Sequence, residues 1–252
     1  MKSILIVLPS AYIIFCLVLF FFQRKLMYFP QAAGRVEGVT ECRFENDDEK
    51  LHGWVVNEGN SNALIYYGGN AERIEQNIPF FRSLLPGYTV YLVCYRGFGN
   101  STGEPTEANL YKDALHVFDV VRGTHKATFL MGRSLGSGIA THVAANRQVE
   151  KLVLVTPYDS IENVAKEAYR IFPVSLLLRD KFESWRYIKR ISAETLVLAA
   201  GHDEVISRAR TQNLIAQFEH TKVKSVVIAK AGHNDIQMYP EFSESIRQIL
   251  TE

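Results

Sequence analysis

The chain has 252 residues, of which 47% are hydrophobic and 22% are charged, and its formal net charge is +1. These values are typical of one large globular domain with a full core and argue against a disordered protein. The near-neutral charge, without a long basic run, argues against nucleic-acid binding. The cysteines, Cys16, Cys42 and Cys94, show neither metal-ligand spacing nor a disulfide framework.

The N-terminal residues contain an uncharged apolar run from Ile4 to Phe22, between Lys2 and the basic pair Arg24-Lys25. As a helix this run would be about 28 Å long at ~1.5 Å per residue, close to the thickness of a bilayer's hydrocarbon core. We therefore expect residues 1–30 to form a single-pass membrane anchor and an interfacial segment. The balanced flanking charges leave the side of the membrane open.

Two alternatives to a retained anchor are a cleaved signal peptide and a buried core helix. A signal peptide needs small residues at its cleavage site, and Gln31-Ala32-Ala33 is a poor version of one. The apolar run is also longer than the hydrophobic region of most signal peptides. These features favour the retained anchor.

The remaining residues, 31–252, alternate between short apolar runs typical of strands and periodic runs typical of helices. We expect strands at 40–44, 51–56, 63–67, 88–95, 128–131, 152–155, 195–200 and 225–229, and helices at 74–85, 107–122, 139–146, 207–218 and 240–250. Thr106 and Gly123 are the expected ends of the second of these helices. The first two strands flank an acidic turn and predict an antiparallel hairpin.

Strand–helix alternation of this kind is typical of an α/β fold whose central sheet is mainly parallel and covered by helices on both faces. Residues 161–191 are less regular and predict a small cap-like excursion from an α/β-hydrolase domain that spans 31–252. The excursion contains the apolar group 172–178, which is expected to shape the pocket for a substrate.

The centre of the sequence is the motif Gly-x-Ser-x-Gly, present as Gly132-Arg133-Ser134-Leu135-Gly136. An apolar strand precedes it and a helix follows it, which is the setting of a nucleophile on a tight, strained turn. Glycines on both sides of the serine let the backbone turn without a side-chain clash. The serine hydroxyl is then expected to stand at the carboxyl end of its strand.

The partners that such a serine needs are predicted in loops that follow later strands. Asp203 follows the strand at 195–200 and His233 follows the strand at 225–229, so the chain order is serine, acid, histidine. An imidazole can take the serine proton and return it to the leaving group, and a buried carboxylate on its other nitrogen stabilises the imidazolium. Asp235 and Glu204 compete with Asp203 for the acid role.

The oxyanion hole is expected to consist of two backbone N–H groups. One belongs to Leu135, directly after the nucleophile, and the other to Asn70, with Ala71 as the neighbouring possibility. His202 lies beside the predicted acid and is expected near the site. The other histidines, His52, His116, His125, His142 and His220, lack a partner pattern and are expected to be surface or structural residues.

Over nearly its whole length the chain resembles the membrane-anchored α/β-hydrolase-domain serine hydrolases, a group that includes protein depalmitoylases. The residues that carry the resemblance are Tyr28-Phe29-Pro30, Gly69-Asn70-Ala71, Tyr95-Arg96-Gly97-Phe98-Gly99-Asn100-Ser101, Gly132-Arg133-Ser134-Leu135-Gly136, Thr156-Pro157-Tyr158, Asp203-Glu204-Val205 and Gly232-His233-Asn234-Asp235. The resemblance implies Ser134 as nucleophile, Asp203 as acid and His233 as base.

The chain departs from this group at three places. Gly68 stands where the group usually has the histidine of its oxyanion loop, and Ser207 stands where a proline often follows the acid loop. The cysteine-rich N-terminal segment of the eukaryotic depalmitoylases is absent. The last departure weakens a transfer of the depalmitoylase activity itself.

Together these features predict a membrane-anchored serine hydrolase that cleaves carboxyl esters or thioesters, with a small-molecule or acyl-group substrate and without a metal or cofactor. A serine peptidase or amidase on the same fold is one alternative, because the same three residues cleave amides. A non-catalytic, membrane-tethered interaction protein is the other.

Overall fold

The fold is built around one eight-stranded sheet, described by a computed structural model that covers residues 2–219 and 222–251. The sheet order is β1-β2-β4-β3-β5-β6-β7-β8. The strands are β1 (Thr40–Asn46), β2 (Glu49–Val56), β3 (Asn62–Tyr67), β4 (Tyr88–Val93), β5 (Ala127–Arg133), β6 (Lys151–Val155), β7 (Glu194–Ala200) and β8 (Val223–Ile228). β2 runs antiparallel to β1 and β4, and the other pairs are parallel, which confirms the predicted hairpin and mainly parallel sheet.

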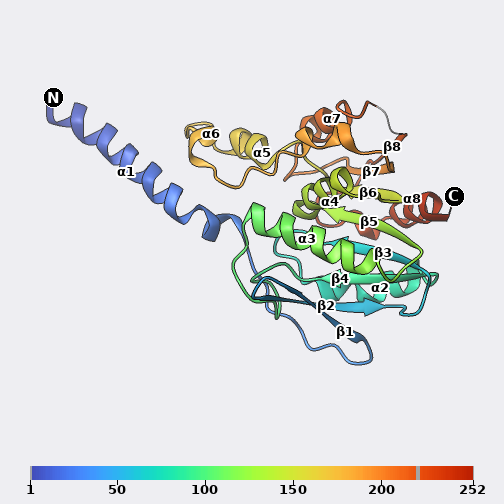
Figure 1. Cartoon of the computed structure of the whole chain (residues 1–252). Helices are drawn as coiled ribbons and strands as arrows, with labels where there is room; N and C mark the ends of the chain where they lie inside the picture. The colour runs from blue at the N-terminus through green and yellow to red at the C-terminus, as the bar shows by residue number, and fades with distance from the viewer. Residues whose placement is uncertain (1, 220–221, 252) are drawn as a thin grey trace.

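Helices cover both faces of this sheet (Figure 1). They are α1 (Lys2–Met27), α2 (Ile78–Leu84), α3 (Glu107–Arg122), α4 (Leu135–Asn146), α5 (Ile161–Ala168), α6 (Val174–Leu177), α7 (Arg208–Ile215) and α8 (Pro240–Thr251), with 3₁₀ turns η1 (Ile74–Asn77), η2 (Ser184–Arg186), η3 (Ile188–Arg190) and η4 (Ile236–Met238). α3 and α4 pack together on one face, and α2 and α8 on the other, where the rings of Phe80 and Phe242 lie 5.9 Å apart. The predicted α/β fold is confirmed.

The central strands are buried on both faces, which explains their nearly continuous apolar sequence. Residues 63–65 of β3 and 152–155 of β6 are fully buried. The helix after β4 begins as predicted, because the Thr106 side chain accepts a hydrogen bond from the Asn109 N–H at 3.1 Å. Cys94, Tyr66 and Tyr67 are also buried.

Some element boundaries differ from the prediction. The helix expected at 74–85 is divided into η1 and α2, and Pro79 lies in the first turn of α2, where its missing N–H costs nothing. The helix after Ser134 begins at Leu135 rather than at 139. The later start was expected because glycine is a poor helix former, and glycines occupy positions 136 and 138. α7 is shorter than the expected 207–218, and β8 begins two residues earlier than expected.

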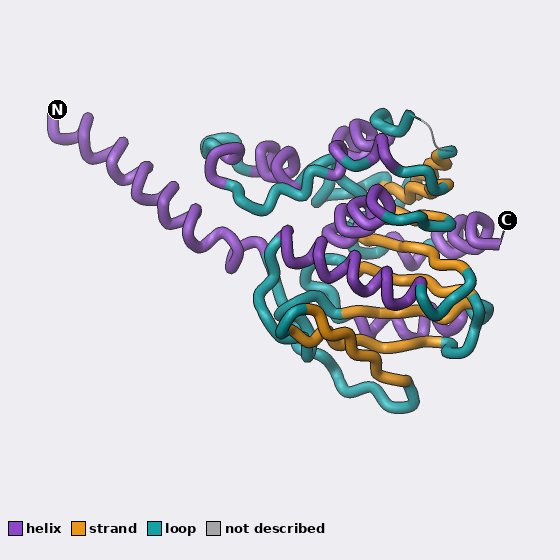
Figure 2. The backbone as a smooth tube through the Cα atoms, in the orientation of Figure 1, coloured by secondary structure: helices purple, strands orange, loops and turns teal. Residues whose placement is uncertain are grey.

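The apolar N-terminal run forms the long helix α1, which projects from the sheet domain (Figure 1, Figure 2). Residues 7–27 are long and apolar enough to span a membrane. Most of their side chains are exposed, so the alternative of a buried core helix is wrong. The helix leaves the domain beside the cap-like excursion that contains α5 and α6.

Candidate active site

Ser134 occupies the turn between β5 and α4 with φ of +49° and ψ of −117°. This backbone conformation is strained for a residue with a Cβ atom, as the motif predicts. The Ser134 N–H donates to the carbonyl of Val155 at 2.9 Å, and its carbonyl accepts bonds from both the N–H and the hydroxyl of Ser137. These three bonds hold the serine at the carboxyl end of β5.

The glycines of the motif are required by close packing. A Cβ atom on Gly136 would lie 2.0 Å from the carbonyl oxygen of Tyr67, and one on Gly132 would lie 2.3 Å from the carbonyl oxygen of Gly136. Both distances are far below van der Waals contact. The two glycines therefore let α4 approach β3 and β5 closely enough to form the turn.

His233 connects Ser134 to Asp203. Its Nε2 lies 2.9 Å from the Ser134 Oγ, and its Nδ1 lies 2.9 Å from Asp203 Oδ2 and 3.0 Å from Oδ1. The side chains of His233 and Asp203 are 7% and 6% exposed. The structure thus brings together Ser134 from the loop after β5, Asp203 from the loop after β7 and His233 from the loop after β8. These are the residues that the sequence predicts as nucleophile, acid and base.

The carboxylate beside the imidazole is held by its own loop. Asp203 Oδ1 accepts hydrogen bonds from the N–H groups of Val205 at 2.9 Å and Ile206 at 2.7 Å. These bonds orient the carboxylate towards His233. The acidic loop therefore presents Asp203, and not its neighbour, to the imidazole.

The two competing carboxylates brace the histidine loop instead. Asp235 Oδ1 accepts the Gly232 N–H at 2.7 Å, and Glu204 Oε2 accepts the His233 N–H at 3.3 Å. Neither carboxylate contacts the imidazole. His202 is exposed.

The loop after β3 lies beside Ser134. A Cβ atom on Gly69 would be 3.8 Å from the Ser134 Cβ. The Gly69 N–H is already bonded to the carboxylate of Glu72, whereas the structure gives the N–H of Asn70 no acceptor among the described residues. Across the site, the N–H of Leu135 is the first of α4 and has no acceptor within the helix. The assignment of these two N–H groups to an oxyanion hole stays a prediction.

Two residues that organise this loop were missed by the sequence analysis. Glu72 accepts bonds from Gly69, from the Tyr66 hydroxyl at 2.8 Å and from the Asn77 amide at 2.5 Å. Arg133 lies 4.0 Å from Glu72 and also donates to the carbonyl of His233 at 3.3 Å. Arg133 thus connects the loop of Glu72 with the loop of His233. Its charge, at the variable position directly before the nucleophile, is the signal in the sequence that could have indicated this connection.

The side chain of Asn70 was also missed. Its Nδ2 donates to the carbonyl of Met27 at 2.6 Å, and its Oδ1 accepts the Phe29 N–H at 3.1 Å. Both polar ends of the amide are therefore used to join the loop beside Ser134 to the end of α1. No local pattern in the sequence signals this contact, because 43 residues separate the Asn70 and Met27 partners.

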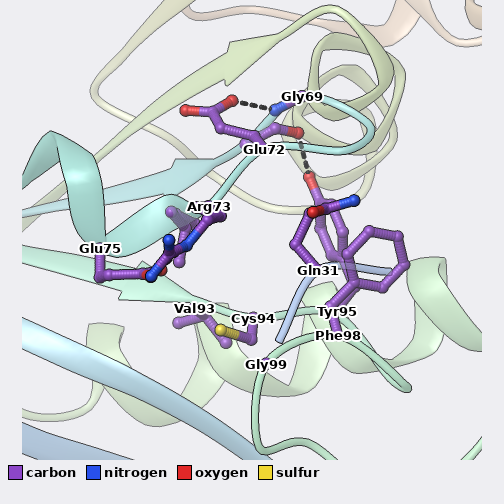
Figure 3. A pocket seen from close by; sticks show the side chains of 12 residues that line it. Gln31, Gly69, Glu72, Arg73, Glu75, Val93, Cys94, Tyr95, Phe98 and Gly99 are labelled. Atoms are coloured by element: carbon purple, nitrogen blue, oxygen red, sulfur yellow. Dashed lines mark hydrogen bonds and ion pairs between the residues drawn. The ribbon is translucent and has the colours of Figure 1, made fainter. Parts of the chain in front are cut away.

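A small pocket lies beside the same loop (Figure 3). Figure 3 shows Gly69 and Glu72 at its top, Arg73 and Glu75 on one side, and Tyr95 on the other. Ser134, His233 and Asp203 are not among its lining residues. It therefore backs the loop and is not the place where the Ser134 hydroxyl meets a substrate.

The other histidines that the structure describes do not form a second candidate site. His52 and His142 are packed against aromatic rings, and His125 contacts Thr124. His220 lies outside the described residues. Within the described part of the chain, no group of three or more His, Cys, Asp or Glu side chains could hold a metal ion. The absence of a cofactor stays a prediction.

Known proteins resemble this chain in sequence and fold. A family model described as serine aminopeptidase, S33, matches residues 67–186. An uncharacterised protein of Mycobacterium tuberculosis is 30% identical over 251 residues, which cover 91% of this chain and 88% of that protein. The human alpha/beta hydrolase domain-containing protein 17B is 26% identical over 202 residues, covering 75% of this chain and 66% of that protein.

Solved structures show the same architecture. An esterase from Pyrococcus furiosus superimposes with a TM-score of 0.71 at 18% identity, covering 89% of this chain and 98% of that one. The ferulic-acid-bound Est1E of Butyrivibrio proteoclasticus has a TM-score of 0.66 at 15% identity, covering 83% and 98%. At these identities the likeness is one of fold. The chain belongs to the α/β-hydrolase family, and the fold and family together make it a hydrolase.

Proposed function

We propose that this hydrolase cleaves carboxyl esters or thioesters through an acyl-serine intermediate. In this mechanism Ser134 is the nucleophile, His233 the general base, and Asp203 the carboxylate that orients the imidazole. The observation that carries the proposal is the continuous hydrogen-bonded line from the Ser134 hydroxyl through both ring nitrogens of His233 to Asp203. This arrangement is the working geometry of acyl transfer by a serine.

The reaction takes place in two halves. Ser134 Oγ attacks the acyl carbon while His233 Nε2 takes its proton, and the oxyanion accepts bonds from the N–H groups of Asn70 and Leu135. His233 then gives the proton to the leaving oxygen or sulfur. Water then attacks the acyl carbon and loses a proton to the same nitrogen, and His233 returns that proton to Ser134 Oγ as the acyl–oxygen bond breaks and the acid leaves.

Apolar surroundings support an ester or thioester over an amide substrate. The Phe29 side chain is exposed, and the Phe29 N–H donates to the side chain of Asn70 in the loop beside Ser134. Such a surface suits an acyl chain better than a polar peptide. The description of the matching family model as a serine aminopeptidase keeps amide cleavage as the second candidate.

We also propose that α1 is retained as a single-pass anchor. Arg24 binds Asp180 through two bonds of 2.9 and 3.2 Å, and Tyr28 donates to the same carboxylate at 3.1 Å. Asp180 is buried. Cleavage near Ala33 would remove both partners and leave a buried charge unpaired, which is strongly destabilising. The contacts do not depend on which side of the membrane the domain faces.

A fluorophosphonate probe tests the nucleophile. We expect the wild-type chain to be labelled, the Ser134→Ala variant to be unlabelled, and the Ser61→Ala variant to be labelled like the wild type. Ser61 is an exposed serine just before β3, at the opposite end of the strands from Ser134. Equal labelling of the Ser134→Ala variant would overturn the proposal. Comparing a short aryl ester with an aminoacyl amide of the same acyl group then separates the two candidate activities.

A further inference from the structure

The excursion is bound along the side of α1. We call residues 169–178, the turn after α5 together with α6, the cap edge. The Tyr12 hydroxyl donates to the carbonyl of Ile171 at 2.6 Å, and its ring stacks on Phe172 with centroids 6.0 Å apart. Further along α1, Gln23 Nε2 donates to the carbonyl of Leu177 at 2.9 Å. The cap edge therefore accompanies α1 from Tyr12 to Gln23, as Figure 1 shows for α6.

The length of α1 makes this contact important for the membrane. The part of α1 that is long and apolar enough to span a membrane is Val7–Met27, so the contacts at Tyr12 and Gln23 both lie within it. The stretch after Tyr12 also needs apolar surroundings, because Ile13, Leu17 and Phe21 are 57%, 51% and 71% exposed. When lipid surrounds these α1 side chains, the cap edge lies at the same depth in the bilayer, because it is bound to α1.

The cap edge has the composition and bonding that a lipid environment requires. Ile171 and Leu176 are 76% and 80% exposed. Its carbonyls at Ile171 and Leu177 accept bonds from α1 side chains, and the N–H groups of Leu176 and Leu177 both donate to the carbonyl of Pro173. Backbone groups that are already paired do not lose hydrogen bonds to water when lipid surrounds them.

Cationic side chains mark one end of this surface. The Arg179 guanidinium lies over the ring of Phe20 at 5.7 Å, and the Lys25 ammonium lies over the ring of Phe22 at 5.8 Å. Aromatic rings and basic side chains at one level along a membrane helix are typical of the headgroup region. The cap edge extends from this level towards Tyr12, that is, towards the acyl chains.

We propose that the cap edge enters the same leaflet as α1, with Ile171 and Leu176 in contact with lipid acyl chains and Arg179 and Lys25 among the headgroups. The bilayer is therefore the partner of this surface. The membrane contact then involves the hydrolase domain itself and not α1 alone.

Lipid-borne quenchers test the proposal on the full-length chain in vesicles of phosphatidylcholine and phosphatidylglycerol. An environment-sensitive fluorophore is attached to Ile171→Cys, to Leu176→Cys, to Ile14→Cys on α1, and to Val227→Cys. Val227 is a matched exposed apolar residue on β8, at the far edge of the sheet from α1. The parent chain, labelled in parallel, gives the background from Cys16, Cys42 and Cys94.

We expect the labels at 14, 171 and 176 to emit at shorter wavelength and to lose most of their fluorescence to lipids that carry a nitroxide on the acyl chain. The label at 227 should respond only to a water-soluble quencher. Water-exposed labels at 171 and 176 beside a lipid-exposed label at 14 would overturn the proposal. Melting curves check that each variant folds, and the two cap-edge sites back each other up. Because fluorescence does not require Ser134, failure here is distinct from failure of the proposed catalytic function.

Discussion

Asn70 donates a 2.6 Å hydrogen bond from its side-chain amide to the carbonyl of Met27, the last residue of α1. The same amide accepts the Phe29 N–H. The backbone N–H of Asn70 is the proposed oxyanion donor. The end of α1 is therefore joined, through one side chain, to the loop beside Ser134.

Replacing this amide should slow the chemical step. In the Asn70→Ala variant the backbone N–H remains but both bonds to the α1 end are lost, each worth about 1 kcal/mol. If these bonds position the loop, their loss should lower kcat about tenfold or more, because ~1.4 kcal/mol of transition-state stabilisation corresponds to a factor of ten in rate. KM should change little. Steady-state hydrolysis of an aryl ester measures both constants.

Asn146→Ala is the control for this substitution. The Asn146 amide donates to the carbonyl of His142 near the end of α4, at an exposed site away from the loop. This variant should keep the wild-type kcat. An Asn70→Ala enzyme with an unchanged kcat would show that the α1 end does not position the loop.

Two bidentate Arg–Asp pairs should differ sharply in their effect on stability. Arg96 binds Asp113 at 2.6 and 2.7 Å with both side chains buried, whereas Arg147 binds Asp119 at similar distances with side chains 36% and 49% exposed. Asp113→Ala removes both short hydrogen bonds of the buried guanidinium, which keeps only the longer ion pairs to Asp47 at 3.7 Å and Glu49 at 3.9 Å, and should lower the free energy of unfolding by about 3 kcal/mol. Asp119→Ala should lower it by about 0–1 kcal/mol. Urea unfolding of the two variants measures the difference, and equal losses would contradict the prediction.

His142 should make stability depend on pH. Burial, with the nearby charges of Arg190 and Arg147, lowers the pKa of His142 from its ordinary 6.5 to about 4, and its ring stacks on Tyr111 at 3.9 Å. Between these two pH values the unfolded chain binds more protons than the folded one. The free energy of unfolding contributed by this group therefore falls as the pH drops from about 6.5 to about 4, and changes no further below that range.

His142→Phe isolates the effect, because phenylalanine keeps the stacking but does not titrate. Relative to this variant, the wild-type chain should lose stability when urea unfolding is repeated from pH 7 down to pH 4. The carboxylates are common to both chains, so their contribution cancels in the comparison. A difference that is the same at pH 7 and pH 4 would contradict the prediction.

Much of the fold was predictable because its signals are local. Apolar strands, the Thr106 cap and the glycines around Ser134 each act within a few residues, and the structure contains all of them. The start of α4 was not predictable, because Gly136 is a poor helix former that is kept for its contact with the Tyr67 carbonyl. That contact joins residues from two different strand–helix units.

The same distinction separates the predicted from the missed residues of the candidate site. Ser134, Asp203 and His233 follow the parallel strands β5, β7 and β8, so their positions along the chain already indicate that they meet at one edge of the sheet. Glu72 and Arg133 act by bridging loops, and apart from the charge of Arg133 directly before the nucleophile no local pattern marks them. Arg133 reaches a carbonyl that is 100 positions away in the chain.

The sequence by itself determined the alternation of strands and helices, the nucleophile motif and the apolar length of α1, because each depends on spacing along the chain. Only the tertiary structure decided that Asp203, rather than Asp235 or Glu204, lies against the imidazole of His233. It also decided that α1 is bound to Asn70 and to the cap edge. Hydrogen bonds between distant loops depend on where the strands end in space, and no local pattern of residues specifies that position.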